Sequence, residues 1–450
     1  MKKFLHLGAI FFLLIGCNKD ETNQGENNGN LTIPVVIIGG VSNIESDNAT
    51  VGGDVTSNGG VNVIAKGICW SVNPNPDIND TKSTEGSGAG VFSSQLTSLI
   101  DDTTYFVRAY ATNDIGTAYS NEVSFVTAGL CTGGVYTSSL YVTTQEELDA
   151  FGVNGYCEIT GSVRVSEEVT DLSPLSTVKI IGKDLHISSA HKLVNLNGLN
   201  NITSVGEDLS IRVNNGLTSI AALENISSVG KDVEIVQNPV LTSISSLINI
   251  SGPLNGKLII QNNYILESMY GLNNITSVNG DLDVIANYLI TNLNGLNSIT
   301  NVTGQVELSY NDELVSTEGL NALTSIDKSF KVMLNPLLTN FNSLNNLNSV
   351  AWSFRITDCP SIASIDGLSG LTTVGNTFKI EDADFITNVD SLSSLEAVGT
   401  DLAIIGNDVL TDLCGITNIV ELNGVSGTII IGGNAYNPSI QDILDGNCSQ

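Results

Sequence analysis

Few residues in this sequence have the types and spacing needed for acid–base or metal chemistry. Only 3 of the 450 residues are histidine, and His6 lies in the N-terminal segment MKKFLHLGAIFFLLIGC. His186 and His191 have no cysteine or carboxylate cluster near them at ligand spacing, so two surface histidines are favoured over a zinc site. No serine lies in a GxSxG-type motif, and neither a P-loop nor a dinucleotide fingerprint occurs. We therefore expect no enzyme activity, no metal and no cofactor.

Carboxylates and cations each recur at a fixed interval in the C-terminal part of the chain. The recurring aspartates are Asp184, Asp208, Asp232, Asp281 and Asp401. Such a row could bind calcium, but we favour side chains that accept hydrogen bonds from backbone N–H groups at corners.

The recurring cations are Lys331, Arg355 and Lys379, on successive repeats. Because neighbouring strands lie about 4.8 Å apart, these cations repel one another unless an anionic ligand or acids such as Glu381 stabilise them. We take the three cations as candidate ligand-binding residues, with a solvated sheet as the alternative. The adjacent outward row is predicted to expose four apolar side chains: Val236, Ile285, Met333 and Ile405.

The elements that position these rows are set by an internal repeat of 24 residues with one insertion. Its apolar anchors are Ile181, Val205, Val229, Leu254, Val278, Val302, Ile326, Val350, Val374, Val398 and Leu422. After Val205, Leu209 and Ile211 are two residues apart and share one face of a strand, whereas the later apolar positions are three apart. A helix would mix threes and fours, so the pattern predicts an all-β coil with a leucine-rich interior.

One polar position repeats with the apolar ones. It is occupied by Asn214, Asn238, Asn263, Asn287, Asn311, Asn335, Cys359 and Asn407. Asparagines stacked at a tight bend can hydrogen-bond the backbone of the next coil through their amides. Cys359 shares this row, so we interpret it as a structural substitution and not as a nucleophile.

With an LxLxxN strand and no helical second half, the repeat resembles the receptor L domain. That family implies a right-handed parallel β-helix with leucine-rich coils, here over residues 131 to 450. A solenoid must also cap its exposed apolar ends. Thr144 and Glu147 have the spacing of a capping box for a first short helix, in which Leu148 and Phe151 could plug the core.

The C-terminal cap is predicted to be a second short helix that starts at Asn437-Pro438. The receptor L-domain family places a disulfide, here Cys131–Cys157, across the first helix, and Cys414 with Cys448 would pin the second. Export to an oxidising compartment favours both bonds. Free thiols are the alternative.

The N-terminal segment is predicted to be a targeting signal. Leu14-Ile15-Gly16-Cys17 resembles a bacterial lipobox, which implies cleavage before Cys17 and lipidation of its thiol. The acidic run that follows resembles the export tag of Gram-negative lipoproteins on the outer face of the outer membrane. We expect a signal peptide at 1–16 and a lipidated flexible tether at 17–31. An ordinary secretory signal with a chance cysteine is the alternative.

Residues 32–128 alternate between short apolar strands and Gly, Asn, Asp and Pro clusters, which is typical of an antiparallel sandwich. The run TTYFVRAYATNDIGTAYSNEVSF, residues 103 to 125, resembles the last strands of a fibronectin type III domain. The resemblance implies that Tyr105 is a corner tyrosine and that Trp70 is the buried aromatic residue. Residues 129–450 then form the solenoid.

The formal net charge of −30 excludes nucleic acid as a partner. We expect a non-enzymatic recognition or adhesion lipoprotein at the cell surface, anchored in the outer membrane by its lipid, that binds a glycan or a protein through the solenoid sheet. A polysaccharide lyase-like β-helix enzyme and a purely structural surface stalk are the alternatives.

Overall fold

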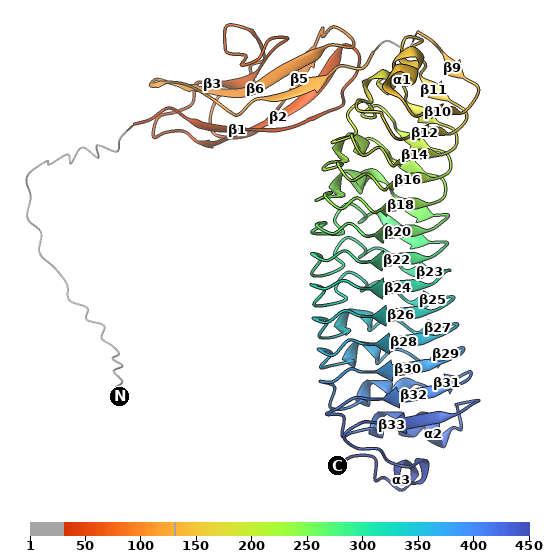
Figure 1. Ribbon diagram of the computed structural model, residues 1–450. Helices are drawn as coiled ribbons and strands as arrows, with labels where there is room; N and C mark the ends of the chain where they lie inside the picture. The colour runs from red at the N-terminus through yellow and green to blue at the C-terminus, as the bar shows by residue number, and fades with distance from the viewer. Residues whose placement is uncertain (1–30, 130–131) are drawn as a thin grey trace, which may run out of the picture. The chain divides into compact units, whose positions relative to one another are not determined.

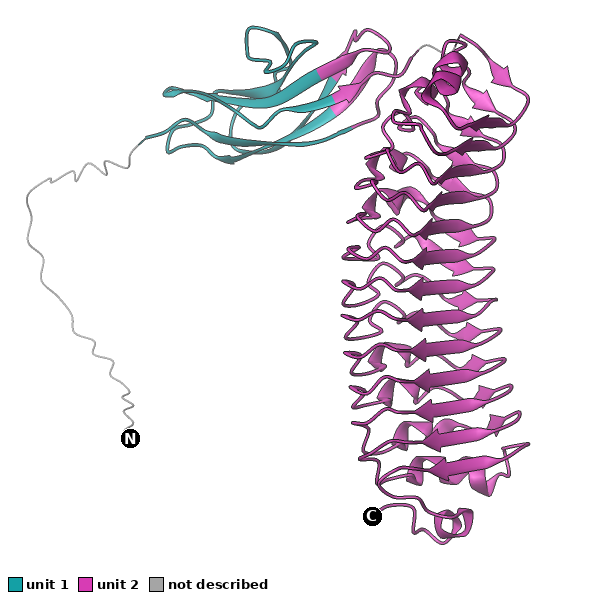
Figure 2. Ribbon diagram, viewed as in Figure 1, with its two compact units in different colours: residues 1–41, 51–95, 106–124 teal, residues 42–50, 96–105, 125–450 magenta. Residues whose placement is uncertain are grey.

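The computed structural model describes residues 31–129 and 132–450 (Figure 1). The predicted signal peptide, the lipidation site Cys17 and nearly all of the predicted tether lie outside these residues, and so does Cys131. The described chain consists mostly of β-strands with a few short helices, and it is dominated by parallel sheets of 13 and 7 strands. It divides into two compact units: one holds the described residues up to 41 with 51–95 and 106–124, and the other holds 42–50, 96–105 and 125–450 (Figure 2).

The first eight strands form two sheets. One sheet has the order β1-β2-β5, and the other has the order β4-β3-β6-β7 with β8 paired to β6. The strands are β1 (Val35–Ser42), β2 (Asn48–Ser57), β3 (Ala65–Ser71), β4 (Thr81–Lys82), β5 (Gly90–Thr97), β6 (Thr104–Asn113), β7 (Gly116–Tyr119) and β8 (Val123–Val126). Trp70 is buried, and the Tyr105 hydroxyl accepts a hydrogen bond from the Ile100 N–H at 3.1 Å. The segments expected from their alternation to be strands, 35–38, 61–68, 105–111 and 122–126, correspond to β1, β3, β6 and β8, whereas β2, β4, β5 and β7 were not assigned.

The rest of the chain winds into stacked coils, each of which adds one strand to a 13-stranded parallel sheet (Figure 1). Its strands are β10 (Leu140–Val142), β12 (Val163–Val165), β14 (Leu185–Ser188), β16 (Leu209–Arg212), β18 (Val233–Val236), β20 (Leu258–Gln261), β22 (Leu282–Ile285), β24 (Val306–Ser309), β26 (Phe330–Met333), β28 (Phe354–Thr357), β30 (Phe378–Glu381), β32 (Leu402–Ile405) and β33 (Ile429–Gly432). From β14 to β33 the register is unbroken, so a given position of every coil lies in one row.

Two sheets of shorter strands form a second side of the coils. The first contains β9 (Val135–Tyr136), β11 (Glu158–Ile159), β13 (Ile180–Ile181), β15 (Ser204–Val205) and β17 (Ser228–Val229). The second contains β19 (Gly252–Leu254), β21 (Ile275–Val278), β23 (Asn301–Val302), β25 (Ser325–Ile326), β27 (Ser349–Val350), β29 (Thr373–Val374) and β31 (Ala397–Val398). The segment after each long strand contains irregular turns or a short 3-10 helix: η1 (Ser173–Leu175), η2 (Ala221–Leu223), η3 (Ser245–Asn249), η4 (Asn342–Leu344), η5 (Asp366–Leu368), η6 (Asp390–Ser394) and η7 (Cys414–Ile416).

The apolar repeat forms one continuous core. The ten anchors from Ile181 to Val398 are all buried. The eleventh, Leu422, is 57% exposed, so its assignment was wrong. Helix α2 (Thr417–Glu421) lengthens this coil, and Val425 takes the place opposite Val398 instead. Inside the sheet, Phe330, Phe354 and Phe378 stack with ring centroids 5.1 Å apart in each pair.

Helix α1 (Gln145–Gly152) confirms the predicted capping box. The Thr144 side chain accepts a hydrogen bond from the Glu147 N–H, and the Glu147 carboxylate accepts one from the Thr144 N–H at 3.2 Å. Leu148 and Phe151 are buried in the same core as the leucine rows. The helix therefore covers apolar side chains at the start of the solenoid.

Helix α3 (Ile440–Leu444) begins later than predicted. Its N-cap is Ser439, whose side chain accepts from the Asp442 N–H in a second capping box. The prediction that Asn437 caps this helix is wrong, because the Asn437 side chain accepts from the Asn434 N–H instead. A disulfide joins Cys414 to Cys448 with 4.9 Å between their Cα atoms.

Candidate binding surface of the parallel sheet

The asparagine row forms a buried hydrogen-bonded ladder where each coil leaves the 13-stranded sheet. Asn311 is typical: its Oδ1 accepts from the Asn287 N–H at 3.1 Å, and its Nδ2 donates to the Val284 carbonyl at 2.9 Å. Its own N–H and Nδ2 reach Asn335 Oδ1 at 3.0 and 3.3 Å. The asparagines in this row are fully buried. An asparagine followed by another asparagine in the row therefore joins its coil to the coils before and after it.

The residue before each ladder position has a left-handed backbone. It has a positive φ at Ser189, Val213, Gln237, Asn262, Ala286, Tyr310, Leu334, Asp358, Asp382 and Gly406. Only the last of these is glycine, and a non-glycine residue in this region costs roughly 1 kcal/mol. The ladder amides and the strand register hold this bend, which recurs at the same place in each of these coils.

Cys359 fills the ladder position of its coil as a buried thiol. Its Sγ lies 3.4 Å from the Thr357 carbonyl, and burial raises the pKa of the thiol to about 11. A thiol with a raised pKa and no exposure is a poor nucleophile. The buried Cys69 of strand β3 is similar, with its pKa also raised by burial to about 11.

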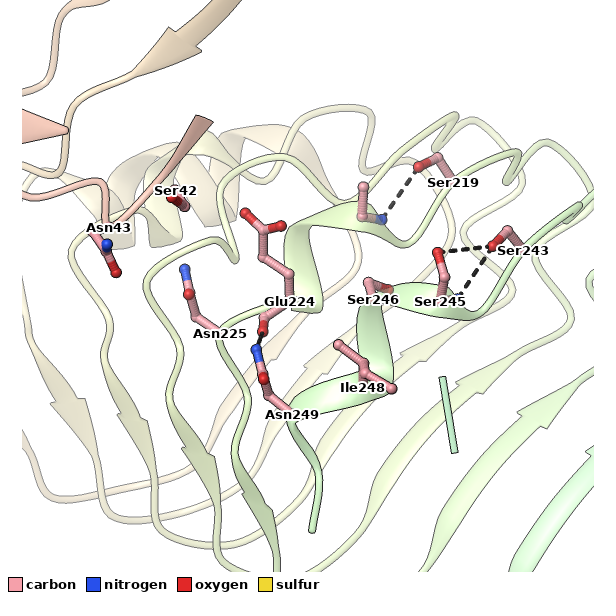
Figure 3. Close-up of a pocket in the computed structure, with 11 residues that line it drawn as sticks. Ser42, Asn43, Ser219, Glu224, Asn225, Ser243, Ser245, Ser246, Ile248 and Asn249 are labelled. Carbon is pink, nitrogen blue, oxygen red and sulfur yellow. Dashed lines mark hydrogen bonds between the residues drawn. The ribbon is translucent and has the colours of Figure 1, made fainter. Parts of the chain in front are cut away.

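A second asparagine row was missed by the sequence analysis. On the side of the coils that holds the 3-10 helices, the Nδ2 groups of Asn201, Asn225, Asn249, Asn274 and Asn346 each donate to a carbonyl of the preceding coil at 2.7 Å. Figure 3 shows Asn249 reaching the main chain of Glu224. The row was hidden because Ser298 and Ala322 interrupt it, although the interval of 24 or 25 residues was visible in the sequence.

The aspartate row accepts hydrogen bonds from backbone N–H groups of the next coil. Asp232 Oδ1 accepts from the Lys257 N–H at 2.7 Å, Asp281 Oδ1 from the Gln305 N–H at 3.0 Å, and Asp401 Oδ1 from the Thr428 N–H at 2.9 Å. These contacts support the corner role over a calcium row.

His186 does have carboxylates near it, so the statement that no such cluster surrounds it was wrong. One ligand atom each from Asp184, His186 and Asp208 lie within 4.8 Å of one another. Asp184 lies two residues before His186 in the same coil, and its 3.4 Å contact with the imidazole was visible as a short spacing in the sequence. Asp208 joins them from the next coil because adjacent coils are in register, which spacing within one coil does not reveal. The Asp184 carboxylate also accepts from the Ser162 hydroxyl at 3.0 Å and lies 3.9 Å from the Arg164 guanidinium. Since these neighbours already occupy that carboxylate, we assign no metal to the cluster.

The three candidate cations lie in one outward row of the sheet, in register with each other. Lys331 Nζ is 2.9 Å from Gln305 Oε1 and 3.5 Å from Glu307 Oε2. Lys379 Nζ is 2.5 Å from Glu381 Oε2. Arg355, between them, is exposed and has no ion pair within the described residues. Nearby acids therefore offset the repulsion at the two lysines, which was one of the two explanations given for the cation row. The Arg355 guanidinium has no such acid and remains open to a partner.

The acidic end of the same row contains Asp283, half-buried beside Gln305. Burial and then the nearby Glu307 and Asp281 carboxylates raise the pKa of Asp283 to about 6, against a hydrogen bond from the Gln305 amide at 3.2 Å. The side chains of this row therefore form a connected polar network across several coils.

The adjacent row is less exposed than predicted. Val236 is buried, so it was wrongly placed among the exposed apolar positions, and Ile285, Met333 and Ile405 are half-buried. Parallel neighbours in the row cover part of each side chain, as happens on any continuous sheet.

Comparison with known proteins adds little. No protein-family model and no curated protein matches the sequence. Among solved structures, the sensor domain of the anti-sigma factor RsgI4 from Pseudobacteroides cellulosolvens is 18% identical over 22% of this chain and 100% of that one, with a TM-score of 0.18. A similarity at that score carries no argument. Within the described residues, no helix combines the length and apolarity needed to cross a membrane.

Proposed function

We propose that the protein is a non-enzymatic recognition or adhesion lipoprotein of the cell surface, which binds a glycan or a protein through the outward face of the 13-stranded sheet. The proposal rests on the unbroken register of that sheet. Thirteen strands at about 4.8 Å give a continuous face roughly 60 Å long. An extended repetitive surface of this kind suits an extended partner.

The chemistry of the outward row also supports recognition. From β18 to β30 the row passes from acids to cations, through Glu234, Ile259, Asp283, Glu307, Lys331, Arg355 and Lys379. The core and ladder rows are nearly uniform, whereas this row varies from coil to coil. Variation confined to the outward side of the sheet favours a binding role over a purely structural one.

We further propose the finer architecture. Residues 129–450 are a receptor L-domain-like leucine-rich solenoid, and residues 32–128 are a fibronectin type III-like sandwich that serves as a spacer. Buried Trp70, the Tyr105 hydroxyl at the Ile100 N–H, and the Cys414–Cys448 disulfide support these assignments. The lipid on Cys17 and the Cys131–Cys157 disulfide belong to the same proposal.

The test replaces the three cations together, as Lys331→Ser/Arg355→Ser/Lys379→Ser. Binding of the mature chain to broad glycan arrays and surface-protein arrays is then compared with that of the unmodified protein. We expect at least tenfold weaker binding for the ligand that uses this face. If every interaction of the unmodified protein survives the change, the sheet face is not the binding surface.

A charge-matched control separates local from global effects. The variant Lys179→Ser/Lys183→Ser/Lys192→Ser removes the same charge from exposed positions outside the sheet strands. It should bind as the unmodified protein does. Equal losses in both variants would indicate a general electrostatic effect and would contradict a site at the cationic row.

A further inference from the structure

A hollow opens at the corner where three successive coils enter the 13-stranded sheet, just before strands β24, β26 and β28. It is lined by Gln305, Asp327, Lys328, Ser329 and Trp352 and has a volume of about 320 Å³. The indole side chain is 58% exposed, although large aromatic side chains are usually well covered.

The backbone around the indole is fixed by its neighbouring coils. The Trp352 N–H donates to the Lys328 carbonyl at 3.0 Å, and the Trp352 carbonyl accepts from the Asn376 N–H at 2.8 Å. Strand β28 begins two residues later, with the buried Phe354. The backbone that carries the indole ring is therefore held on both sides and is not a free loop. A ligand that packs on the exposed ring face has little backbone entropy to remove.

Polar groups flank the ring. The Asp327 carboxylate is exposed and makes no side-chain hydrogen bond or ion pair among residues 31–129 and 132–450. The Lys328 ammonium is also exposed and lies 4.0 Å from the nearest carboxylate oxygen, on Asp281. The Gln305 amide, by contrast, is held by Lys331 and the neighbouring acids. The hollow therefore combines the flat apolar face of the indole with two polar groups. The Asp327 carboxylate is an acceptor without a side-chain partner, and the Lys328 ammonium is a donor with one distant partner.

This combination matches the surface of a pyranose ring. A hexose has a face of C–H groups, which packs on an aromatic ring, and an edge of hydroxyls, each of which both donates and accepts hydrogen bonds. The hydroxyls can bridge a carboxylate acceptor and an ammonium donor.

Charge decides between neutral and acidic sugars. The chain has a formal net charge of −30, and Asp327, Asp281, Asp283 and Glu307 lie at or close to the hollow. A uronic acid or sulfated sugar would be repelled at long range and, in the hollow itself, would compete with Asp281 for the ammonium of Lys328. A neutral sugar meets no such cost.

We propose that the Trp352 hollow binds a neutral hexose residue of a glycan, with the ring face on the indole and the hydroxyls on Asp327 and Lys328. This inference rests on the proposed recognition function and names its ligand class. Trp352 precedes Arg355 by three residues and Lys328 precedes Lys331 by three, so a glycan chain leaving the hollow continues onto the outward row.

Tryptophan fluorescence tests this directly, because the protein contains 2 tryptophans. Trp70 is 8% exposed and Trp352 is 58% exposed, so collisional quenching by acrylamide reports mainly on Trp352. The mature chain would be titrated with cello-, manno- and laminari-oligosaccharides, and with polygalacturonate as an acidic comparison. A neutral oligosaccharide should shift the emission to the blue and reduce quenching at least twofold, whereas polygalacturonate should change neither.

Variants separate the site from the function. In calorimetric titrations with the same oligosaccharide, Trp352→Ala should weaken binding at least thirtyfold and Asp327→Asn about tenfold. Phe385→Ala, which removes another exposed aromatic ring (62% exposed) outside the hollow, should leave affinity unchanged. Far-UV circular dichroism would verify that each variant is folded.

Three results would overturn the inference in distinguishable ways. Glycan binding that survives Trp352→Ala places the sugar elsewhere, while the recognition function stands. Polygalacturonate binding that shifts the Trp352 emission, without any neutral sugar doing so, makes the ligand class wrong. Binding to proteins on the array but to no glycan removes the sugar site and leaves the proposed function intact.

Discussion

The buried asparagine ladder gives the sharpest stability prediction, for Asn311→Ala. The alanine removes the acceptor of the Asn287 N–H and both Nδ2 bonds, to the Val284 carbonyl and to Asn335 Oδ1. All of these groups lie in the fully buried row or at its edge.

The magnitude follows from those three contacts. A buried N–H without a partner costs about 1–3 kcal/mol, and each lost hydrogen bond costs about 0.5–1.5 kcal/mol. The sum predicts that the free energy of unfolding falls by about 2–6 kcal/mol. The matched control is Asn346→Ala, at an exposed member of the second row, where a single bond to the Asn321 carbonyl is lost and about 1 kcal/mol is expected.

Urea denaturation of the full chain, followed by far-UV circular dichroism, measures both changes. Hydrogen exchange with mass-spectrometric readout adds a local probe, because the Asn287 amide should lose protection in Asn311→Ala and keep it in Asn346→Ala. A loss of less than about 1 kcal/mol, or unchanged protection at Asn287, would refute the view that the ladder amides hold the coils together.

The remaining predictions concern ionisation, covalent pinning and a single buried hydroxyl. The pKa of Asp283 is about 6 in the folded state and about 3.9 in the unfolded chain, so its ionisation destabilises the fold as pH rises from about 4 through 6. Asp283→Asn should therefore raise the free energy of unfolding by about 1–2 kcal/mol at pH 7 and by almost nothing at pH 4. Urea titrations at the two pH values measure the difference. The Cys414–Cys448 bond closes a loop with a sequence separation of 34, so replacing both cysteines by serine should lower the free energy of unfolding by about 3–4 kcal/mol. Alkylation of either cysteine in denatured, unreduced protein, detected by peptide mass mapping, would argue against the bond. Ser391 Oγ is buried and has no hydrogen-bond partner in the described chain. Ser391→Ala should therefore leave the free energy of unfolding unchanged or raise it by up to about 1 kcal/mol, which thermal denaturation measures. A clear fall in the thermal midpoint would reveal a partner.

Repetition explains why the solenoid was predictable. Every coil must place the same apolar side chains inside, so residues such as Leu209 and Leu402 repeat the same environment and the period appears in one sequence. The ladder asparagines were visible for the same reason. The same period gave a wrong prediction at Leu422. Helix α2 lengthens the coil that precedes β33, so Leu422 lies at the surface and not in the core.

Features that occur once were not predictable from the period. Trp352 is an aromatic residue at a position that Lys328 and Asn376 occupy in the neighbouring coils, and only the coil-to-coil geometry shows that it lines a hollow with Lys328. The cluster around His186 likewise depends on contacts between adjacent coils. In the N-terminal sheets, β2 and β5 were missed because glycines and short polar side chains dilute their alternation, and their burial depends on partners far along the chain.

Contacts between coils have a consequence for the length of the solenoid. The ladder bonds from Asn263 to Asn335 and the sheet pairings from β20 to β32 join residues 24 positions apart, whereas Cys359 interrupts the ladder on the following coil. Excising or duplicating one whole period between Asn263 and Asn335 would therefore re-form these bonds between new but equivalent partners. The solenoid can therefore be lengthened or shortened in steps of about 4.8 Å, while the capping helices α1 and α3 at its two ends stay unchanged.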